Sequence, residues 1–415
     1  LQTLCFYPDI ARGVLRYLSV HQAADTIPAQ DAEPGKILHE QRKGEMVACK
    51  EIPFGHYYGA VDTTPLFVML AGEYYARSAD KDFLKTLWPS IQQALNWIDT
   101  LGDLDQDGFV EYKRKTEKGL ENQGWKDSSD SVFHKNGQLA NPPIALCEVQ
   151  AYVYAAKVAA ARLANVLGFK DQAKELYQRA ETLKKKFANV FWCEDIASFA
   201  IALDARKDPC QIRSSNAAHC LFTGIAENVH AEGIAQWIMG PKSFSGWGIR
   251  TIPQEELRYN PMSYHNGSVW PHDNSLIAYG LARYGYKKQA AHIMTALFEA
   301  GLSMDLCRLP ELFCGFTRRE GEGPTLYPVA CDPQAWAAGS VFLLLQSCLG
   351  LSVDAEERTV HFDRPVLPDF LPEIYIRNFS LGDCLADLRI SQDPAGKVSI
   401  DAMNKSGQIQ VRTTA

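Results

Sequence analysis

A chain of 415 residues with 46% hydrophobic and 22% charged residues has the composition of a folded globular protein, which excludes an intrinsically disordered chain. Its formal net charge of −7 and its longest basic run, Lys184–Lys186, argue against a nucleic-acid partner, and no stretch approaches the roughly 18 uninterrupted apolar residues of a membrane span. Eleven scattered cysteines without a C-x-x-C pair, and no positively charged apolar leader, predict reduced thiols and a cytoplasmic location.

Helical periodicity dominates the first 350 residues. In segment 170–192 the apolar positions recur at three- and four-residue steps and define one buried face: Ala173, Leu176, Tyr177, Ala180, Leu183, Phe187 and Phe191. Similar patterns predict helices over about 9–20, 65–78, 82–100, 144–167, 214–223, 227–239, 272–284, 286–300 and 333–349. Pro89 and Pro271 fit the first turn of a helix, where a missing N–H costs nothing, so we expect segment 82–100 to be broken at Trp88.

The predicted helices are joined alternately by short turns and by long polar and aromatic segments, which cover 21–62, 101–143, 241–271 and 303–332. Long ordered loops are usually functional. An (α/α)6 toroid, a ring of six helical hairpins, gives such loops a common place, because the loops at one end of the ring build a funnel. We therefore predict a mainly α catalytic domain over residues 1–350. About ten helices are fewer than the twelve of a complete ring, so we expect one or two to have escaped the pattern or to precede Leu1.

From about residue 351 the pattern changes to an alternation of apolar and polar residues. The segments "RTVHFDRPVL", "EIYIRNFSLG", "CLADLRISQD" and "KVSIDAMNKSGQIQVRT" stand between Gly, Pro, Asn and Asp turns, which is typical of antiparallel strands. Residues 351–415 are therefore predicted to form a small C-terminal β region.

Three loop segments place carboxylates among aromatic residues: "GWKDSSDS" (124–131), "RYNPMSYHNGSVWPHDN" (258–274) and "RLPELFCGF" (308–316). A sugar presents hydroxyl groups around its rim and C–H groups on its faces, so a sugar site needs polar side chains around the ring and flat side chains above or below it. The aromatic candidates are Trp125, Trp247, Tyr264, Trp270 and Phe313. The polar candidates are Asp62, Lys126, Arg250, His265, Asn266, His272 and Asp273.

Cleavage of a glycosidic bond needs two carboxyl groups, one that protonates the leaving oxygen and one that activates water or attacks the anomeric carbon. We predict Asp127 as the acid and Glu311 as the base. Trp125 can desolvate Asp127, which favours the protonated form, whereas Lys126 opposes this effect if its ammonium points inward. Glu311 follows Pro310, whose stiff backbone suits the positioning of a nucleophilic water.

Structural roles compete with these assignments. Asp and Ser in "KDSSDS" are also ordinary turn and N-cap residues, and Asp130 in particular fits such a role. Glu148, on an otherwise apolar helical stripe, is either a buried residue bonded to a loop or a site residue that reaches in from the barrel wall.

Metal and phosphate motifs are incomplete. The segment "GDLDQDGF" (102–109) opens like a calcium loop, but the twelfth position from Asp103 is Arg114, where an EF-hand needs a bidentate Glu, so we expect a turn. The histidines show no H-E-x-x-H spacing and are expected to serve as hydrogen-bonding residues. The segment "GFTRREGEG" (315–323) lacks the phosphate-loop pattern. We therefore predict neither a metal nor a cofactor.

Six segments over about residues 50–350, in one consistent order, resemble the amylo-alpha-1,6-glucosidase or glycogen-debranching-enzyme family, within the wider group of (α/α)6-barrel glycoside hydrolases: "VDTTPLFVMLAGEY", "NQGWKDSSDS", "EVQAYVY", "YNPMSYHNGSVWPHDN", "LPELF" and "DPQAWAAGS". The resemblance implies an inverting hydrolase of glucosidic linkages, with an oligosaccharide or glucan substrate. It also implies that the general acid lies in the "WKDS" run and the general base in the "LPEL" run, which are Asp127 and Glu311 here.

The resemblance has limits. Debranching enzymes of the eukaryotic type carry a separate transferase domain for which 415 residues have no room, and bacterial relatives commonly have a β-rich domain before the barrel. Other α-glucosides or mannose-containing substrates stay open, because related barrels vary their loops. A glycoside phosphorylase would need an anion site, for which Arg308, Arg318 and Arg319 are candidates. A carbohydrate-binding protein would keep the pocket without catalysis.

Overall fold

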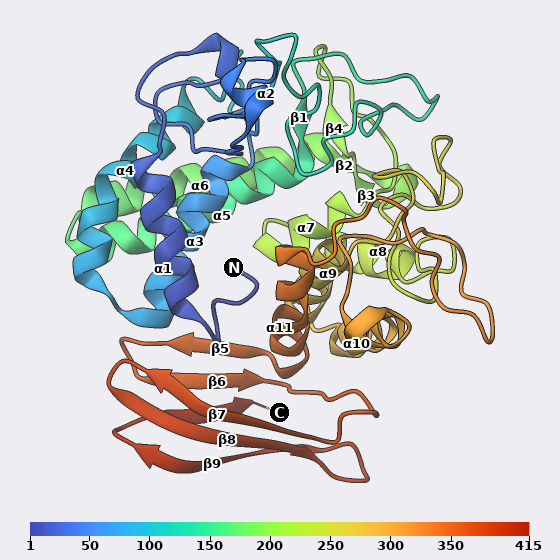
Figure 1. Cartoon of the computed structure of the whole chain (residues 1–415). Helices are drawn as coiled ribbons and strands as arrows, with labels where there is room; N and C mark the ends of the chain where they lie inside the picture. The colour runs from blue at the N-terminus through green and yellow to red at the C-terminus, as the bar shows by residue number, and fades with distance from the viewer. Residues whose placement is uncertain (415) are drawn as a thin grey trace.

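The computed structural model describes residues 1–414. In Figure 1 the helices fill the upper part of the molecule, the C-terminal strands lie beneath them, and long loops gather above and to the right. The helices are α1 (Pro8–Val20), α2 (Glu45–Ala48), α3 (Thr63–Ser78), α4 (Lys81–Asp99), α5 (Cys147–Leu167), α6 (Lys170–Phe191), α7 (Asn216–Thr223), α8 (Asn228–Ile238), α9 (Pro271–Arg283), α10 (Lys287–Leu302) and α11 (Ala335–Leu349).

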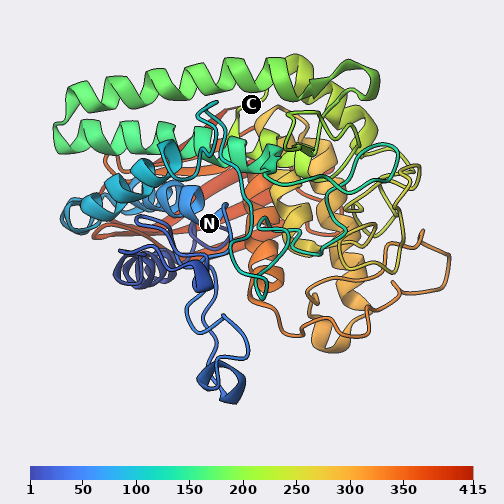
Figure 2. The same cartoon turned by 90° about the horizontal axis from the view of Figure 1, so that it is seen from above.

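The helices form two layers. Along the inner wall α3, α5, α7, α9 and α11 pack side by side in that order, while α4, α6, α8 and α10 each pack against this wall. Burial differs between the two layers: every residue of the inner helix α7 is buried, whereas the outer helix α6 buries only one stripe. Tyr177, which was predicted to belong to that stripe, is exposed to solvent. Figure 2 shows α5 and α6 as a long antiparallel pair. The predicted mainly α toroid is confirmed.

Helix α4 runs through Pro89 without a break, so the expected interruption at Trp88 is wrong. Because Pro89 has no N–H, the carbonyl of Lys85 lacks its helical hydrogen bond. Both residues lie on the exposed side of the helix, where water can donate to this carbonyl instead. The opposite side buries Trp88 and Ile91 in the core, and a break would expose them. Pro271, by contrast, occupies the first turn of α9 as predicted.

Close packing within the inner wall depends on Gly280, in the middle of α9. A Cβ atom at this position would lie 2.7 Å from the backbone nitrogen of Phe222 and 3.1 Å from the carbonyl oxygen of Ala218, both in α7. We expect Gly280→Ala to lower the midpoint of thermal unfolding by several degrees, because overpacking typically costs about 1–3 kcal/mol.

The matched control is Gly13→Ala in α1, where no atom lies within 4 Å of the added Cβ. Alanine is the better helix former, so this variant should leave the midpoint unchanged or raise it slightly. Equal midpoints for the two variants, measured by circular dichroism, would contradict the close approach of α7 and α9.

The C-terminal region contains two three-stranded sheets, with strand orders β10–β6–β5 and β7–β8–β9. Three of the four strand pairs are antiparallel as predicted, but β10 pairs with β6 in parallel, because the turn after β9 carries the chain across to the other sheet. The strands are β5 (Leu351–Asp354), β6 (Thr359–Asp363), β7 (Glu373–Leu381), β8 (Cys384–Gln392), β9 (Val398–Ser406) and β10 (Gln410–Thr414). Four two-residue strands lie in the loops of the helical part: β1 (Ala145–Leu146), β2 (Trp192–Cys193), β3 (Ser198–Phe199) and β4 (Ala202–Leu203).

The sheets share a core that includes Phe362, Phe379 and Leu388, and this core also contains residues of α11 and of the segment before α1. Helix α3 contacts the sheets as well. The Arg77 guanidinium lies 4.8 Å from the Phe379 ring, and the Tyr75 hydroxyl donates to Glu356 Oε1 at 2.6 Å. The last helix ends and β5 begins near residue 350, and the division into domains 1–350 and 351–415 stays a prediction.

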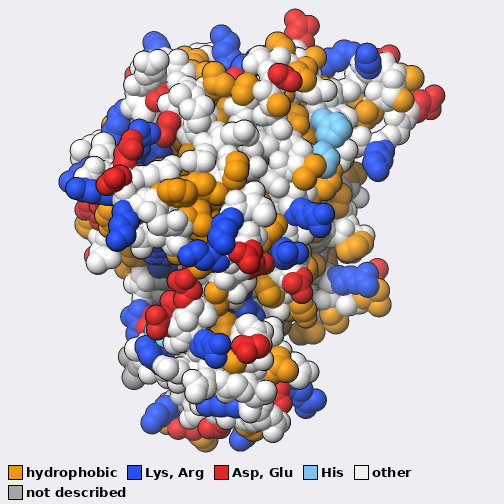
Figure 3. All heavy atoms as spheres, turned by 90° about the vertical axis from the view of Figure 1, so that its left-hand side faces the viewer, with side chains coloured by type: hydrophobic (Ala, Val, Ile, Leu, Met, Phe, Trp, Pro, Cys, Tyr) orange, Lys and Arg blue, Asp and Glu red, His pale blue; other side chains and the backbone are white. Residues whose placement is uncertain are grey.

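The surface carries charges of both signs. On the face that Figure 3 shows, acidic and basic side chains are interspersed with apolar ones. Within residues 1–414, none of the helices has the length and apolar character that a bilayer crossing requires.

Candidate active site

The N-terminal ends of the five inner helices carry polar or aromatic side chains that lie together. Asp62 precedes α3, Glu148 stands in the first turn of α5, His219 in α7, Asp273 in α9 and Trp336 in α11. The α7 and α9 ends are joined by a hydrogen bond in which His219 Nε2 is 2.7 Å from Asp273 Oδ1. The positive ends of the helix dipoles favour carboxylates at these positions.

Trp125 lies at the centre of an aromatic cluster. Its ring stacks on that of His219 with the centroids 5.8 Å apart, and it meets the rings of Trp270 and His272 edge-on at 5.8 and 4.9 Å. His272 in turn stacks on Trp336 at 3.9 Å. Among the described residues, neither the indole nitrogen of Trp125 nor that of Trp336 has a hydrogen-bond partner. Flat rings and free donors of this kind are what a sugar ring requires.

The two predicted catalytic carboxylates lie on separate loops and are joined by two intervening side chains. Asp127 Oδ1 is 3.8 Å from His265 Nδ1, and the His265 ring packs against that of Tyr264 with the centroids 4.6 Å apart. The Tyr264 hydroxyl donates to Glu311 Oε1 at 2.7 Å, and the Cys331 N–H donates to Glu311 Oε2 at 3.0 Å. We call this arrangement the carboxylate bridge: Asp127, His265, Tyr264 and Glu311.

The environments of the two carboxylates differ. The Asp127 side chain is 42% exposed, whereas Glu311 is 5% exposed. Partial burial raises the pKa of Asp127, and the negative charges of Glu40 and Glu311 raise it further against an opposing backbone hydrogen bond. A raised pKa keeps more of the carboxyl group protonated, as a general acid requires. Glu311 accepts hydrogen bonds on both oxygens and is held in one orientation.

Lys126 does not oppose the protonation of Asp127. Its ammonium donates to the carbonyl of Thr251 at 2.9 Å and lies 5.0 Å from the centroid of the Trp125 ring. Burial lowers the pKa of Lys126 to about 8, and the charges that act against this effect are those of Asp273 and Glu148. The ammonium therefore belongs to the buried cluster rather than to the environment of Asp127.

Asp62 and Glu148 form a second pair of carboxyl groups, and both are buried. Asp62 is 7% exposed and Glu148 is 1% exposed, and Glu148 Oε1 has no hydrogen-bond partner in residues 1–414. Burial and then the charge of Glu148 raise the pKa of Asp62 to about 7, and burial also raises the pKa of Glu148. Of the two roles left open for Glu148, its place beside Asp62 favours that of a site residue.

We expect Asp62→Asn to stabilise the folded protein at pH 8 while it lowers activity. Because the pKa of Asp62 is raised in the folded protein, the stability from this group is present below about pH 4 and is lost as the pH rises through 7. The amide of the variant cannot ionise, so its free energy of unfolding does not fall in this way as the pH rises. The largest fall expected for the parent is about 4 kcal/mol, which corresponds to a pKa difference of about three.

Thermal unfolding of both proteins at pH 5 and pH 8 checks this prediction. The gain of the variant over the parent should be larger at pH 8. A parent that is at least as stable as the variant at pH 8 would show that Asp62 does not carry a buried charge.

Two predicted sugar contacts have other surroundings. The Arg250 guanidinium donates to the carbonyl of Gly315 at 2.6 Å and to the hydroxyl of Thr317 at 2.9 Å. Trp247 is buried, with the Arg318 guanidinium 4.2 Å from its ring centroid. These contacts fasten loop 241–271 to loop 303–332, and the structure does not bring either residue into the aromatic cluster.

Asn266 and Phe313 also hold loops together. The Asn266 amide donates to the backbone carbonyl of Asp130 at 3.1 Å and so ties loop 241–271 to loop 101–143. Phe313 is fully buried and pairs through its backbone with Val269. Both residues place the carboxylate bridge by fixing the loops that carry it.

The carboxylates of the acidic loop after α4 are paired with a lysine. The carboxylates of Asp103, Asp105 and Asp107 are close enough to hold a metal ion. The Lys207 ammonium lies 3.0 Å from both Asp105 and Asp107 and also pairs with Glu111. Asp103 accepts the N–H of Asp107 at 3.0 Å, as in the predicted turn.

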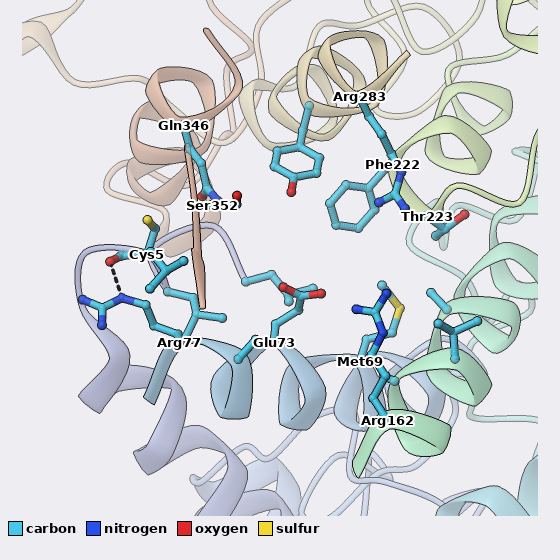
Figure 4. A pocket seen from close by; sticks show the side chains of 18 of the residues that line it. Cys5, Met69, Glu73, Arg77, Arg162, Phe222, Thr223, Arg283, Gln346 and Ser352 are labelled. Carbon is cyan, nitrogen blue, oxygen red and sulfur yellow. Dashed lines mark hydrogen bonds between the residues drawn. The ribbon is translucent and has the colours of Figure 1, made fainter. Parts of the chain in front are cut away.

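A cavity of about 310 Å³ lies at the end of the inner wall that faces β5. All five inner helices contribute to its lining. Figure 4 shows Glu73, Arg162 and Arg283 around it. Burial raises the pKa of Glu73, and the two guanidinium groups oppose this effect. A single carboxyl group cannot supply both an acid and a base, so this cavity lacks the groups that glycoside cleavage needs.

Sequence reasoning did not assign His219, Trp336 or Glu40 to the site. His219 and Trp336 share a feature with Glu148, since each stands in the first turn of its helix. That shared position is a signal that could have found them. Glu40 carries no such signal, because only the fold of loop 21–62 brings it near Asp127.

Residues 8–304 match a protein family described as the mannosylglycerate hydrolase MGH1-like glycoside hydrolase domain. The chain belongs to this family. The matched family consists of glycoside hydrolase domains. Among curated proteins, no sequence matches this chain.

Solved structures that resemble this chain share its fold at low sequence identity. A GH78 rhamnosidase of Bacillus sp. GL1 has a TM-score of 0.66 and 16% identity, over 98% of this chain and 36% of that one. The GH63 mannosylglycerate hydrolase of Thermus thermophilus, in complex with Tris and D-glycerate, has a TM-score of 0.57 and 15% identity, over 82% of this chain and 90% of that one. A sialidase has a TM-score of 0.57 and 15% identity, over 83% of this chain and 32% of that one.

The chain thus spans about a third of the length of the rhamnosidase and sialidase chains that it matches. The family and the structural neighbours support an (α/α)6-type glycoside hydrolase. They do not single out the amylo-alpha-1,6-glucosidase family that the sequence segments resemble.

Proposed function

We propose that the protein is an inverting α-glycosidase in which Asp127 is the general acid and Glu311 the general base. The observation that carries this proposal is the carboxylate bridge, which sets an exposed carboxyl group of raised pKa opposite a buried, doubly hydrogen-bonded one. The aromatic cluster around Trp125 lies against the same bridge, since Trp125 meets His265 edge-on at 5.7 Å.

In the proposed reaction, Asp127 gives its proton to the glycosidic oxygen as the bond to the anomeric carbon breaks. Glu311 accepts a proton from a water molecule, whose oxygen bonds to the anomeric carbon on the opposite face. Exchange with solvent then returns a proton to Asp127 and removes one from Glu311. An inverting pair stands about 6.5–9.5 Å apart to leave room for the water, and the two side chains between Asp127 and Glu311 keep them from direct contact.

For the glycone we propose α-linked glucose, on the support of the six segments that resemble the amylo-alpha-1,6-glucosidase family. Linkages of the α-1,6 type in oligosaccharides or glucans are the first candidates. The family description makes α-mannosides the second candidate.

Proton NMR of the sugar released within minutes tests the proposal. Isomaltose, panose, a branched limit dextrin and an α-mannosyl disaccharide are the substrates. We expect release of the β-anomer from an α-linked substrate. Release of the α-anomer would contradict the inverting mechanism, and no sugar from any glucoside or mannoside would contradict the proposed activity.

No observation favours a phosphorylase. Of the arginines considered for an anion site, Arg318 pairs with Glu299 and Arg319 pairs with Glu322. Turnover that requires added phosphate would overturn the hydrolytic assignment.

A further inference from the structure

His219, in α7, is fixed by hydrogen bonds on both ring nitrogens. Its Nε2 is 2.7 Å from Asp273 Oδ1, and its Nδ1 is 2.7 Å from the Tyr152 hydroxyl. Burial raises the pKa of Asp273, but the hydrogen bond from His219 leads the effects that outweigh burial, so the pKa is lowered and Asp273 is a carboxylate that accepts from Nε2–H. All three side chains are at most 3% exposed. The imidazole therefore cannot rotate without the loss of a buried hydrogen bond.

The fixed imidazole is the ring that lies parallel to Trp125. The two rings are inclined by only 20°, with their centroids 5.8 Å apart. The other three rings around Trp125 stand at 80° or more to it, and they belong to His265, Trp270 and His272. Since Tyr152 belongs to α5 and Asp273 to α9, three inner helices hold one aromatic side chain of loop 101–143 through this stacked pair.

Trp125 stands two residues before the proposed general acid, Asp127. The Asp127 carboxyl group lies 3.8 Å from His265 Nδ1, which is too long for a hydrogen bond, and that nitrogen is 2.8 Å from the Ser128 hydroxyl instead. The place of this carboxyl group is therefore set by the backbone of segment 125–128. The Trp125 ring anchors that segment at its first residue.

We propose that His219 is a positioning residue: it holds the Trp125 ring in the place that lets Asp127 reach the glycosidic oxygen. This inference rests on the proposed function, because it takes Asp127 as the general acid. A displacement of about 1 Å can lower the rate of an enzyme by about 10²-fold. A side chain that does not touch the reacting atoms can therefore control the proton transfer.

His219→Gln is the first test, on the disaccharide that the NMR assay identifies and on the glycosyl fluoride of the same sugar. Glutamine can still donate to Asp273, but it has no ring to lie against Trp125. We expect kcat for the disaccharide to fall at least about tenfold, because the acid is displaced. The fluoride needs little protonation of its leaving group, so its kcat should fall less than about threefold. Equal losses on both substrates, or no loss on either, would overturn the inference.

Tyr152→Phe and its matched control, Tyr284→Phe, separate positioning from stability. Each variant removes one hydroxyl that is hydrogen-bonded within the protein, since Tyr152 contacts His219 and Tyr284 donates to the carbonyl of Ala226 at 2.6 Å. We expect the ratio of kcat for the disaccharide to kcat for the fluoride to fall about two- to tenfold in Tyr152→Phe and to stay at the parent value in Tyr284→Phe. Equal ratios in the two variants would overturn the inference.

NMR reads the placement of Trp125 if neither substrate is cleaved, an outcome that would contradict the proposed activity. The indole N–H signal of Trp125 is one of eight in the chain and is assigned by its absence from Trp125→Phe. We expect this signal to shift in Tyr152→Phe, because the released His219 ring moves, and to stay in place in Tyr284→Phe. An unshifted signal in Tyr152→Phe would overturn the inference whatever the activity.

Discussion

Asp127→Asn is expected to lower kcat/KM by about 10²–10⁴-fold on the disaccharide that the NMR assay identifies, because the amide cannot give a proton to the leaving oxygen. The substitution keeps the size of the side chain, and Asp127 is partly exposed, so the fold should be unaffected. Most of the loss should appear in kcat, since the proton is transferred in the transition state and not on binding.

A substrate with a good leaving group distinguishes loss of the acid from loss of the fold. α-Glucosyl fluoride needs little protonation of its leaving group, so Asp127→Asn should retain most of its activity on the fluoride. Asp130→Asn is the matched control, because Asp130 lies in the same loop and uses its backbone carbonyl, at 3.1 Å from the Asn266 amide. Equal losses for the disaccharide and the fluoride would show that Asp127 is not the acid.

Much of the helical architecture could be predicted because three- and four-residue periodicity reports burial directly. The same reasoning failed at Pro89, where the sequence shows the proline but not the side of the helix on which it stands. Burial of Trp88 and Ile91 on the other side decided the outcome. Likewise the sequence predicts strands near the C-terminus, but it does not show that the turn after β9 crosses to the other sheet.

The site could be predicted in part for a similar reason. Carboxylates beside aromatic residues in the long loops pointed to segments that the fold brings together, as the contact of Asp127 with His265 and that of Tyr264 with Glu311 show. The same composition also selected Arg250, whose guanidinium satisfies one backbone carbonyl of its own loop and one of loop 303–332. Whether a loop arginine faces a ligand or a carbonyl depends on the fold of another loop. Contacts of this kind, such as that between His219 and Asp273, join helices that are far apart in the chain.

Glu311→Gln is expected to lower kcat/KM by about 10²–10⁴-fold on both the disaccharide and the fluoride, because every substrate needs an activated water. Glu311 accepts the Tyr264 hydroxyl at 2.7 Å and the Cys331 N–H at 3.0 Å. An amide oxygen can keep one of these hydrogen bonds, so the side chain should stay in place while its ability to accept a proton is lost. The activities of the two variants should therefore differ most on the fluoride, because Asp127→Asn should cleave it and Glu311→Gln should not.

Glu73→Gln is the control for replacement of a carboxylate away from the proposed site, since Glu73 lines the cavity near β5. We expect this variant to keep the kcat/KM of the parent to within about twofold, because its carboxyl group has no part in the proposed chemistry. Circular dichroism of all variants verifies that they fold. If Glu311→Gln cleaves the fluoride as fast as Glu73→Gln does, then Glu311 is not the base. In that case Glu148, whose Oε1 has no partner among the described residues, becomes the next carboxylate to replace.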